Sequence, residues 1–240
     1  MKIVEAGYEI LTPISAGGIE ELKRIELAAR TCYKSEGRIT ADGSSAKKLV
    51  AALIKRKHFA MLEHGGVVSV RFICDRGISH ELVRHRLASF AQESTRYCNY
   101  GLNSFGNEIT VIKPSWAGEQ TDPEGYKLWK DTMLCCEDAY MEMLQNGYKA
   151  QQARCVLPTC LKTEIVVTAN LREWRAIFEL RCAHDAHPDI RALMVPLWRE
   201  MKHRIPVLFD DCYSGDEGEW SAWDLETQQK VKTVAKAVQE

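Results

Sequence analysis

A chain of 240 residues with 45% hydrophobic and 27% charged residues has the composition of a globular protein with one large domain or two small ones. Its formal net charge of −1 argues against a long polyanion as a partner, because nucleic-acid-binding modules usually carry a clear basic excess. No apolar run reaches membrane-spanning length and no signal segment begins the sequence, so we expect a cytoplasmic protein without a membrane partner.

The cysteines indicate a reducing compartment. There are nine of them, an odd number, and no two are spaced as Cys-x-x-Cys. Several lie within apolar runs, where a free thiol packs as a small hydrophobic group. We therefore expect neither a disulfide framework nor a structural zinc site.

Hydrophobic periodicity predicts the elements of the first ninety residues. Residues 2–11 are typical of an edge strand, and helical spacing follows at 18–33 and at 45–56. Residues 66–74 alternate between apolar and polar side chains, which predicts a half-buried strand. The next helix is expected to open near Gly77 and to continue through an apolar stripe formed by Leu82, Val83, Leu87 and Phe90.

The second half of the chain is predicted to be mainly helical. A loop over 100–122 surrounds one short strand at 109–112. The remaining elements expected along the chain are a long helix at 123–147, a strand at 163–169, and helices at about 172–183 and 189–203.

These elements favour an α+β fold, a single domain of mixed helices packed on a small antiparallel sheet. Strands and helices do not alternate in the βαβ order, and neither a Gly-x-Gly-x-x-Gly motif nor a P-loop is present. We expect the domain to cover residues 1–212, with 213–240 as a C-terminal extension that forms a peripheral helix or a partly ordered tail.

The strongest motif is Arg84-His85-Arg86, followed seven residues later by Ser94 and then by Arg96. Arginine guanidinium groups donate two parallel hydrogen bonds, and together with hydroxyl groups they are suited to binding phosphates and a polar ring. On a helix, three successive side chains would fan over roughly 200°, so they would face two ligand groups or two subunits rather than one small ligand. The alternative is a solvated basic helix surface. An anion site is favoured by Arg86, which would lie beside the apolar stripe.

A second group of cations lies in the last third of the sequence, with Arg154, Arg172 and Arg181 as its members. In the helix after Asn170, Arg181 would share a face with Trp174, Ile177 and Phe178. A charge on an apolar face needs a partner, which here is either a buried structural ion pair or a ligand.

Two other functions were weighed from the residues. A metal-dependent phosphohydrolase would use a cluster of histidines and aspartates made of His58, His64, His184, Asp185, His187 and Asp189. A non-catalytic nucleic-acid module would use the basic segment around Arg84, but the near-neutral net charge argues against it.

The arrangement Arg-His-Arg, seven residues and then Ser resembles the signature of the flavin-dependent thymidylate synthases. The resemblance extends over about residues 1–212. Further matching segments are residues 28–33, His58 with 62–64, Ser94-Thr95-Arg96-Tyr97, 153–154 with 156–158, Asn170-Leu171-Arg172, and Leu180-Arg181. The sequence departs from residues frequent in that family at Ala60, Glu81, Gln92, Ala176 and Asp185.

The resemblance implies a reaction and an assembly. The reaction is methylation of dUMP to dTMP, with FAD as cofactor, methylenetetrahydrofolate as carbon donor and NADPH as reductant, and it releases tetrahydrofolate. The assembly is a homotetramer with active sites shared between subunits, without a metal and without nucleic acid.

The resemblance also implies roles for individual residues. Arg181 would be catalytic, stabilising negative charge at the uracil ring. The residues expected to hold FAD are Arg84, His85, Arg86, Gln92, Asn170 and Arg172. The residues expected to hold dUMP are Glu81, Arg84, Gln92, Glu93, Ser94, Thr95, Arg96, Arg154 and Arg181.

Overall fold

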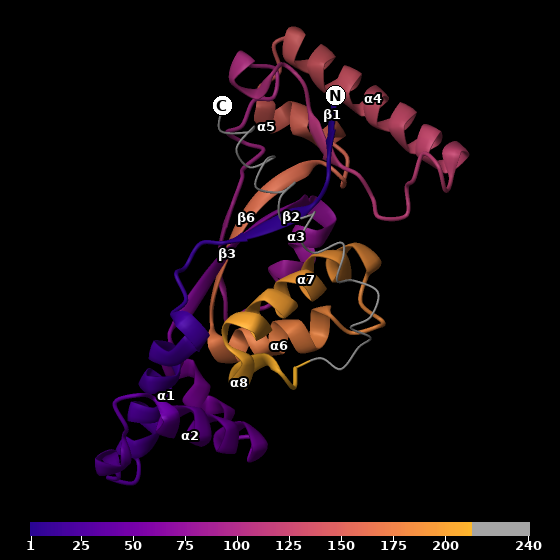
Figure 1. Cartoon of the computed structure of the whole chain (residues 1–240). Helices are drawn as coiled ribbons and strands as arrows, with labels where there is room; N and C mark the ends of the chain where they lie inside the picture. The colour runs from indigo at the N-terminus through magenta and orange to yellow at the C-terminus, as the bar shows by residue number, and fades with distance from the viewer. Residues whose placement is uncertain (213–240) are drawn as a thin grey trace.

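A long pair of antiparallel strands runs through the centre of the elongated molecule, with helices at both ends and along one side (Figure 1). The computed structural model describes residues 1–212. The architecture is the predicted α+β fold with a small antiparallel sheet. Within the described part of the chain, no helix is both long and apolar enough to cross a bilayer. The extension expected at 213–240 lies outside the described residues.

The central sheet has four antiparallel strands in the order β2-β3-β6-β4. These strands are β2 (Gly7–Ile10), β3 (Val67–Asp75), β6 (Lys162–Asn170) and β4 (Ser89–Gln92). A second sheet pairs two short parallel strands, β1 (Lys2–Val4) and β5 (Thr110–Ile112).

Strand β3 shows why this sequence forms a half-buried sheet. Its side chains Val70, Phe72 and Cys74 are fully buried on one face. On the other face, Ser69 Oγ lies 2.8 Å from Oγ1 of Thr168 on β6. Alternation with period two matches the pleat, so one face packs on helices while the other stays polar. The predicted strand at 66–74 is thereby confirmed.

The helices cover the buried face of the sheet and both of its ends. The α-helices are α1 (Ile19–Thr31), α2 (Ser44–Lys55), α3 (Arg76–Leu82), α4 (Pro123–Gln145), α5 (Ala150–Ala153), α6 (Leu171–Arg181), α7 (Pro188–Arg204) and α8 (Pro206–Phe209). Short 3-10 helices are η1 (Ala16–Gly18), η2 (Glu36–Arg38), η3 (Phe59–Gly65), η4 (Asn103–Phe105) and η5 (Arg154–Val156). The five longer helices predicted from periodicity correspond to α1, α2, α4, α6 and α7, within a few residues at each end.

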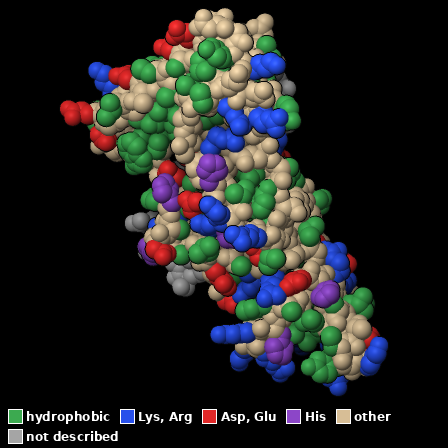
Figure 2. Space-filling model, turned by 180° about the vertical axis from the view of Figure 1, so that it is seen from behind, with side chains coloured by type: hydrophobic (Ala, Val, Ile, Leu, Met, Phe, Trp, Pro, Cys, Tyr) green, Lys and Arg blue, Asp and Glu red, His purple; other side chains and the backbone are tan. Residues whose placement is uncertain are grey.

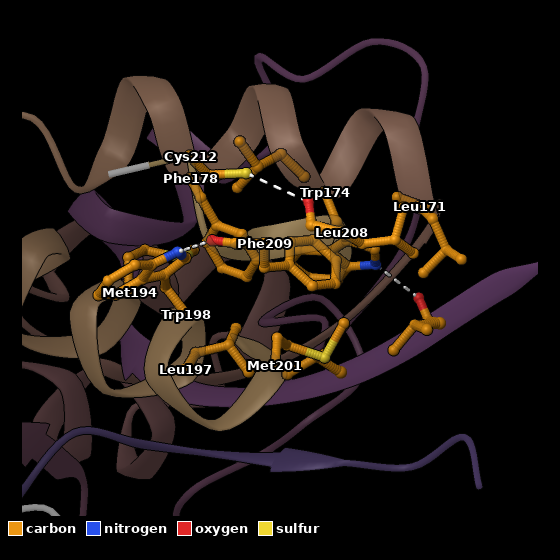
Figure 3. Close-up of a cluster of buried hydrophobic side chains, with 14 of the residues drawn as sticks. Leu171, Trp174, Phe178, Met194, Leu197, Trp198, Met201, Leu208, Phe209 and Cys212 are labelled. Atoms are coloured by element: carbon orange, nitrogen blue, oxygen red, sulfur yellow. Dashed lines mark hydrogen bonds between the residues drawn. The ribbon is translucent and has the colours of Figure 1, made fainter. Parts of the chain in front are cut away.

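Aromatic side chains of α6, α7 and α8 form the centre of the main core (Figure 3). Trp174 and Phe178 of α6 have ring centroids 5.7 Å apart, and Phe178 packs edge-on against Phe209 at 5.6 Å. Both buried indoles are hydrogen-bonded: Trp174 Nε1 donates to the carbonyl of Val68 at 3.0 Å, and Trp198 Nε1 donates to the carbonyl of Phe209 at 2.9 Å. The first of these bonds ties α6 to β3, so core packing fixes the helix that carries Arg181.

Two sequence predictions were wrong in a way that matters for the site. Residues 2–11 form two strands in different sheets, β1 and β2, rather than one edge strand. The helix opening near Gly77 ends at Leu82 and does not continue to Phe90. Phe90 lies instead in β4, opposite Val167 of β6. Pairing with β6 satisfies the backbone of this segment as well as a helix would, and tertiary pairing overrides local periodicity.

The core contact of Trp174 can be tested through stability. We expect Trp174→Ala to lower the free energy of unfolding by about 3–5 kcal/mol, as large-to-small aromatic substitutions do. Trp174→Phe should cost less, about 1–3 kcal/mol, since it leaves the Val68 carbonyl without its donor. Urea unfolding measures both, with Trp116→Phe at a 56% exposed position as the control. A Trp174→Phe variant as stable as the control would contradict this role.

Candidate active site

The Arg-His-Arg motif lies in the turns that connect α3 to β4, not on a helix. The backbone amide of His85 donates to the carbonyl of Leu82 at 3.1 Å, and that of Ala88 donates to His85 at 3.0 Å. These turns leave Arg84 and Arg86 exposed and place His85 inward, with 7% of the residue exposed. The predicted fan over a helix is therefore wrong; two successive turns separate the three side chains instead.

Arg181, at the end of α6, binds this turn with its whole guanidinium group. Its Nε donates to Nε2 of His85 at 3.0 Å. Its Nη1 donates to the Glu81 carboxylate at 2.6 Å, and its Nη2 donates to the Glu81 main-chain carbonyl at 2.9 Å. The Arg181 side chain is 13% exposed. The arginine predicted to lie on the apolar face of α6 thus reaches past the core and forms an ion pair at its edge.

His85 is neutral in this arrangement. Burial and the neighbouring Arg181 cation lower the pKa of His85 from the usual 6.5 to about 4. Its other ring nitrogen, Nδ1, lies 3.7 Å from the Glu173 carboxylate of α6. Glu81, His85 and Arg181 therefore form one group, which the structure assembles from segments about a hundred residues apart.

A second group surrounds the loop after β4. Arg154, from η5, donates to the hydroxyl of buried Thr95 at 3.3 Å. Ser94 Oγ accepts from the backbone amide of Arg96 at 3.3 Å. Arg96 also lies over the ring of Tyr97, with 5.3 Å between the guanidinium carbon and the ring centroid. Exposed Arg96 and the Ser94 hydroxyl thus lie on one short loop, and exposed Arg154 approaches it from η5, as an anion site requires.

Glu93 and Gln92 are held by protein groups next to that loop. Glu93 accepts from the Tyr100 hydroxyl at 2.8 Å and pairs with Lys162 at 3.1 Å. The pKa of Lys162 is raised, because the nearby carboxylates outweigh burial, which alone would lower it. Gln92 donates from Nε2 to the Ser79 hydroxyl at 2.8 Å and to that of Thr163 at 3.2 Å.

A third group lies at the opposite end of α6. Asn170 caps this helix, since its side-chain oxygen accepts from the backbone amide of Glu173 at 2.8 Å. Arg172 is exposed and pairs with Glu63 of η3. Arg172 and Arg181 are nine positions apart along the helix, roughly 14 Å at 1.5 Å per residue. Within residues 1–212, Asn170 and Arg172 form no hydrogen bond or ion pair with Glu81, His85 or Arg181.

The cations of the candidate site differ in whether they have a counter-ion. Figure 2 shows a face on which Lys and Arg side chains gather around the middle of the molecule, with His and carboxylate side chains between them. Within residues 1–212, no carboxylate lies at ion-pair distance from four of the exposed arginines, namely Arg84, Arg86, Arg96 and Arg154. Exposed cations without a carboxylate partner are available to anionic ligands.

The histidines and aspartates proposed for a metal site are not gathered. Among the described residues, no group of three or more His, Cys, Asp or Glu side chains is placed to hold a metal ion. His187 caps α7 by accepting from the backbone amide of Asp189 at 3.2 Å. Asp189 in turn accepts from the backbone amide of Ser115 at 2.9 Å. This segment therefore organises a helix start, and the metal-hydrolase alternative loses its structural support.

Sequence reasoning missed several groups at the site. It did not single out Glu173, whose position four residues before Ile177 and eight before Arg181 was the available signal. It also missed Tyr100 and Lys162, which have no recognisable local pattern. The buried arginine of α6 is Arg175, 3% exposed, which pairs with Asp211 at 2.7 Å.

Comparison with known proteins decides between the alternatives. Residues 19–207 match the model of the family described as "Thymidylate synthase complementing protein". The chain is 34% identical over 195 residues to a flavin-dependent thymidylate synthase of Geobacter sulfurreducens, covering 80% of this chain and 82% of that protein. This chain belongs to the flavin-dependent thymidylate synthase family. The family predicted from the sequence is confirmed.

Other relatives agree. A flavin-dependent thymidylate synthase of Pyrococcus furiosus is 34% identical over 161 residues, which cover 67% of this chain and 64% of that protein. Among solved structures, the chain is similar to the UMP/dUMP methylase PolB of Streptomyces cacaoi, bound with 5-Br dUMP. That similarity has a TM-score of 0.72 at 18% identity and covers 88% of this chain and 96% of the other, so it supports the fold.

The environment of His85 predicts a pH dependence of stability. The folded protein keeps His85 neutral down to about pH 4, whereas the unfolded chain protonates it near the usual 6.5. The contribution of neutral His85 to the free energy of unfolding is therefore fully present above pH 6.5. It is lost as the pH falls towards 4, by roughly 3 kcal/mol at most. Urea unfolding at pH 7 and pH 4.5 measures this. The loss should be smaller in His85→Asn, and equal losses in both proteins would refute the assignment.

Proposed function

We propose that this protein methylates dUMP to dTMP, with methylenetetrahydrofolate as carbon donor and NADPH as reductant through FAD, and that it releases tetrahydrofolate. The observation that carries the proposal is the match of residues 19–207 to the family, with Arg84-His85-Arg86 and Ser94 at the spacing of its signature. Relatives named flavin-dependent thymidylate synthases match over two thirds or more of the chain.

The residues present fit a flavin dinucleotide. Arg84 and Arg86 are exposed, and within residues 1–212 they have no carboxylate partner, as pyrophosphate ligands require. We assign FAD binding to the predicted set, Arg84, His85, Arg86, Gln92, Asn170 and Arg172. When bound, the flavin supplies the hydride that completes the new methyl group, and the protein supplies binding, orientation and electrostatics.

For the substrate, we assign the phosphate of dUMP to Ser94, Arg96 and Arg154. These residues lie on one loop and the η5 segment facing it, where Arg154 reaches Thr95. The remaining predicted contacts to dUMP are Glu81, Arg84, Gln92, Glu93, Thr95 and Arg181. Of these, Glu93 has its carboxylate held in place by Tyr100 and Lys162.

Arg181 is the catalytic residue of the proposal. A guanidinium stays cationic at any physiological pH and donates in a rigid fork, which suits negative charge developing on a uracil ring edge. Glu81 and His85 hold Arg181 before any ligand binds. A preorganised donor needs no reorientation when the charge appears, and this lowers the barrier rather than strengthening ground-state binding.

We further propose a homotetramer with shared active sites. Asn170 and Arg172 lie at the opposite end of α6 from Arg181, roughly 17 Å and roughly 14 Å away along the helix. One site would be complete if Asn170 and Arg172 of a second subunit lay beside Arg181 of the first. A cytoplasmic location accords with the nine free cysteines, all of which lie within the described residues.

The function is tested by absorbance of the purified protein with added FAD. We expect a flavin band that NADPH bleaches, faster with dUMP present, and dTMP formation when methylenetetrahydrofolate is added. The same sample on a sizing column should run as a tetramer. A protein that binds no flavin and forms no dTMP would refute the proposal.

The role of Arg181 is tested by two substitutions. Arg181→Lys keeps the positive charge but loses the planar guanidinium group with its fixed N–H donors, and Arg181→Ala loses both. We expect kcat to fall about 100-fold or more in each, the cost of losing a donor to a developing negative charge. Arg38→Ala, at an exposed position outside the site, is the matched control. Turnover of Arg181→Ala close to that of the control would exclude the catalytic role.

A further inference from the structure

Glu173 is a buried carboxylate that the assignments above do not use. The residue is 8% exposed, and within residues 1–212 its side chain accepts no hydrogen bond. Nδ1 of the neutral His85 ring lies 3.7 Å from Glu173 Oε1. Burial raises the pKa of the Glu173 carboxyl group, and the neighbouring Arg172 cation only partly offsets this. A charge at this position is therefore costly, and its presence beside the motif histidine calls for a reason.

The position of Glu173 is fixed by the start of α6. Asn170 caps the helix by accepting from the Glu173 backbone amide at 2.8 Å. Glu173 and Arg181 are eight residues apart and therefore lie on one face of the helix, with Ile177 between them. The ring of His85 meets both ends of this face, since it contacts Arg181 through Nε2 and approaches Glu173 through Nδ1.

The two contacts select one tautomer of His85. Arg181 Nε is a donor, so the His85 Nε2 that receives its hydrogen must carry a lone pair. In a neutral imidazole the hydrogen then resides on Nδ1, the atom that faces Glu173. At 3.7 Å this approach is longer than a hydrogen bond, yet a carboxylate there attracts an N–H and repels a lone pair. Glu173 thus favours the tautomer that can accept from Arg181.

We propose that Glu173 is a positioning residue that sets the tautomer of His85, so that neutral His85 holds the Arg181 guanidinium by its Nε. Nε2 of His85 then accepts from Arg181, and its Nδ1–H faces Glu173 at 3.7 Å. Glu81 holds the other edge of the guanidinium, so Arg181 is fixed on two sides before substrate binds. The kinetic consequence rests on the proposed function, whereas the tautomer does not.

The tautomer is tested on the purified protein without substrate. Solid-state ¹⁵N spectra of histidine-labelled protein at pH 7, with His85 assigned by its absence in His85→Asn, distinguish a protonated from an unprotonated ring nitrogen. We expect hydrogen on Nδ1 in the native protein and a measurable population of the Nε2–H form in Glu173→Gln. Hydrogen on Nε2 in the native protein, or identical spectra in both, would overturn the proposal even if the enzyme proves active.

The kinetic test uses the same substitution. We expect Glu173→Gln to lower kcat about tenfold and to change the KM for dUMP less than kcat. Removing the carboxylate that holds a metal-bound histidine costs about 10- to 100-fold, and the lower end of that range is expected here. Glu179→Gln, on the same helix at a side chain that is 55% exposed, is the matched control. Glu173→Asp, which keeps the charge, should recover part of the loss.

A double-mutant cycle separates positioning from a merely structural effect. If Glu173 acts through His85, then Glu173→Gln should cost nothing further in a His85→Asn background. Full additivity of the two losses would refute the proposed route. Absence of dTMP formation in the native enzyme would instead reject the proposed function, while the ¹⁵N spectra would still decide the tautomer.

Discussion

The nine-residue antiparallel ladder between β3 and β6 is the constraint on which the rest of the structure depends. It pairs Val67 with Asn170 at one end and Asp75 with Lys162 at the other. Helix α3 therefore leaves the sheet at one end of the ladder, and α6 leaves it at the opposite end. Both pack on the same buried face, where Ile78, Trp174 and Ile177 belong to one core with the strand residues.

The lengths of these elements make the two helices meet. A ladder of nine residues is roughly 30 Å long, while the seven residues of α3 and the eleven of α6 together span roughly 27 Å. Helices that fold back from opposite ends thus converge at their C-terminal ends. The carbonyl of Glu81, in the last turn of α3, accepts from the Arg84 backbone amide at 3.2 Å and also from Arg181 at the end of α6 at 2.9 Å.

Charged groups of both signs surround the neutral His85 ring at this meeting point. Arg181 lies between a carboxylate and a neutral imidazole, and a second carboxylate, Glu173, lies on the far side of the ring. Burial lowers the pKa of His85, and Arg181 lowers it further because a protonated His85 would put two cations in contact. Among residues 1–212, the exposed arginines on the neighbouring turns and loops have no such counter-ions, so the motif divides into an internally paired group and a group open to anions.

The sequence by itself determined the family, the α+β class, the five longer helices and the half-buried β3, because hydrophobic periodicity and a spaced motif are local properties. It also indicated that Arg181 needs a partner. Only the tertiary structure decided that residues 84–88 are turns and that Phe90 enters a strand, because pairing with β6 competes with helix formation for the same backbone groups. The partners of Arg181 lie about a hundred residues away and meet it only through the β3–β6 register, which no local pattern specifies.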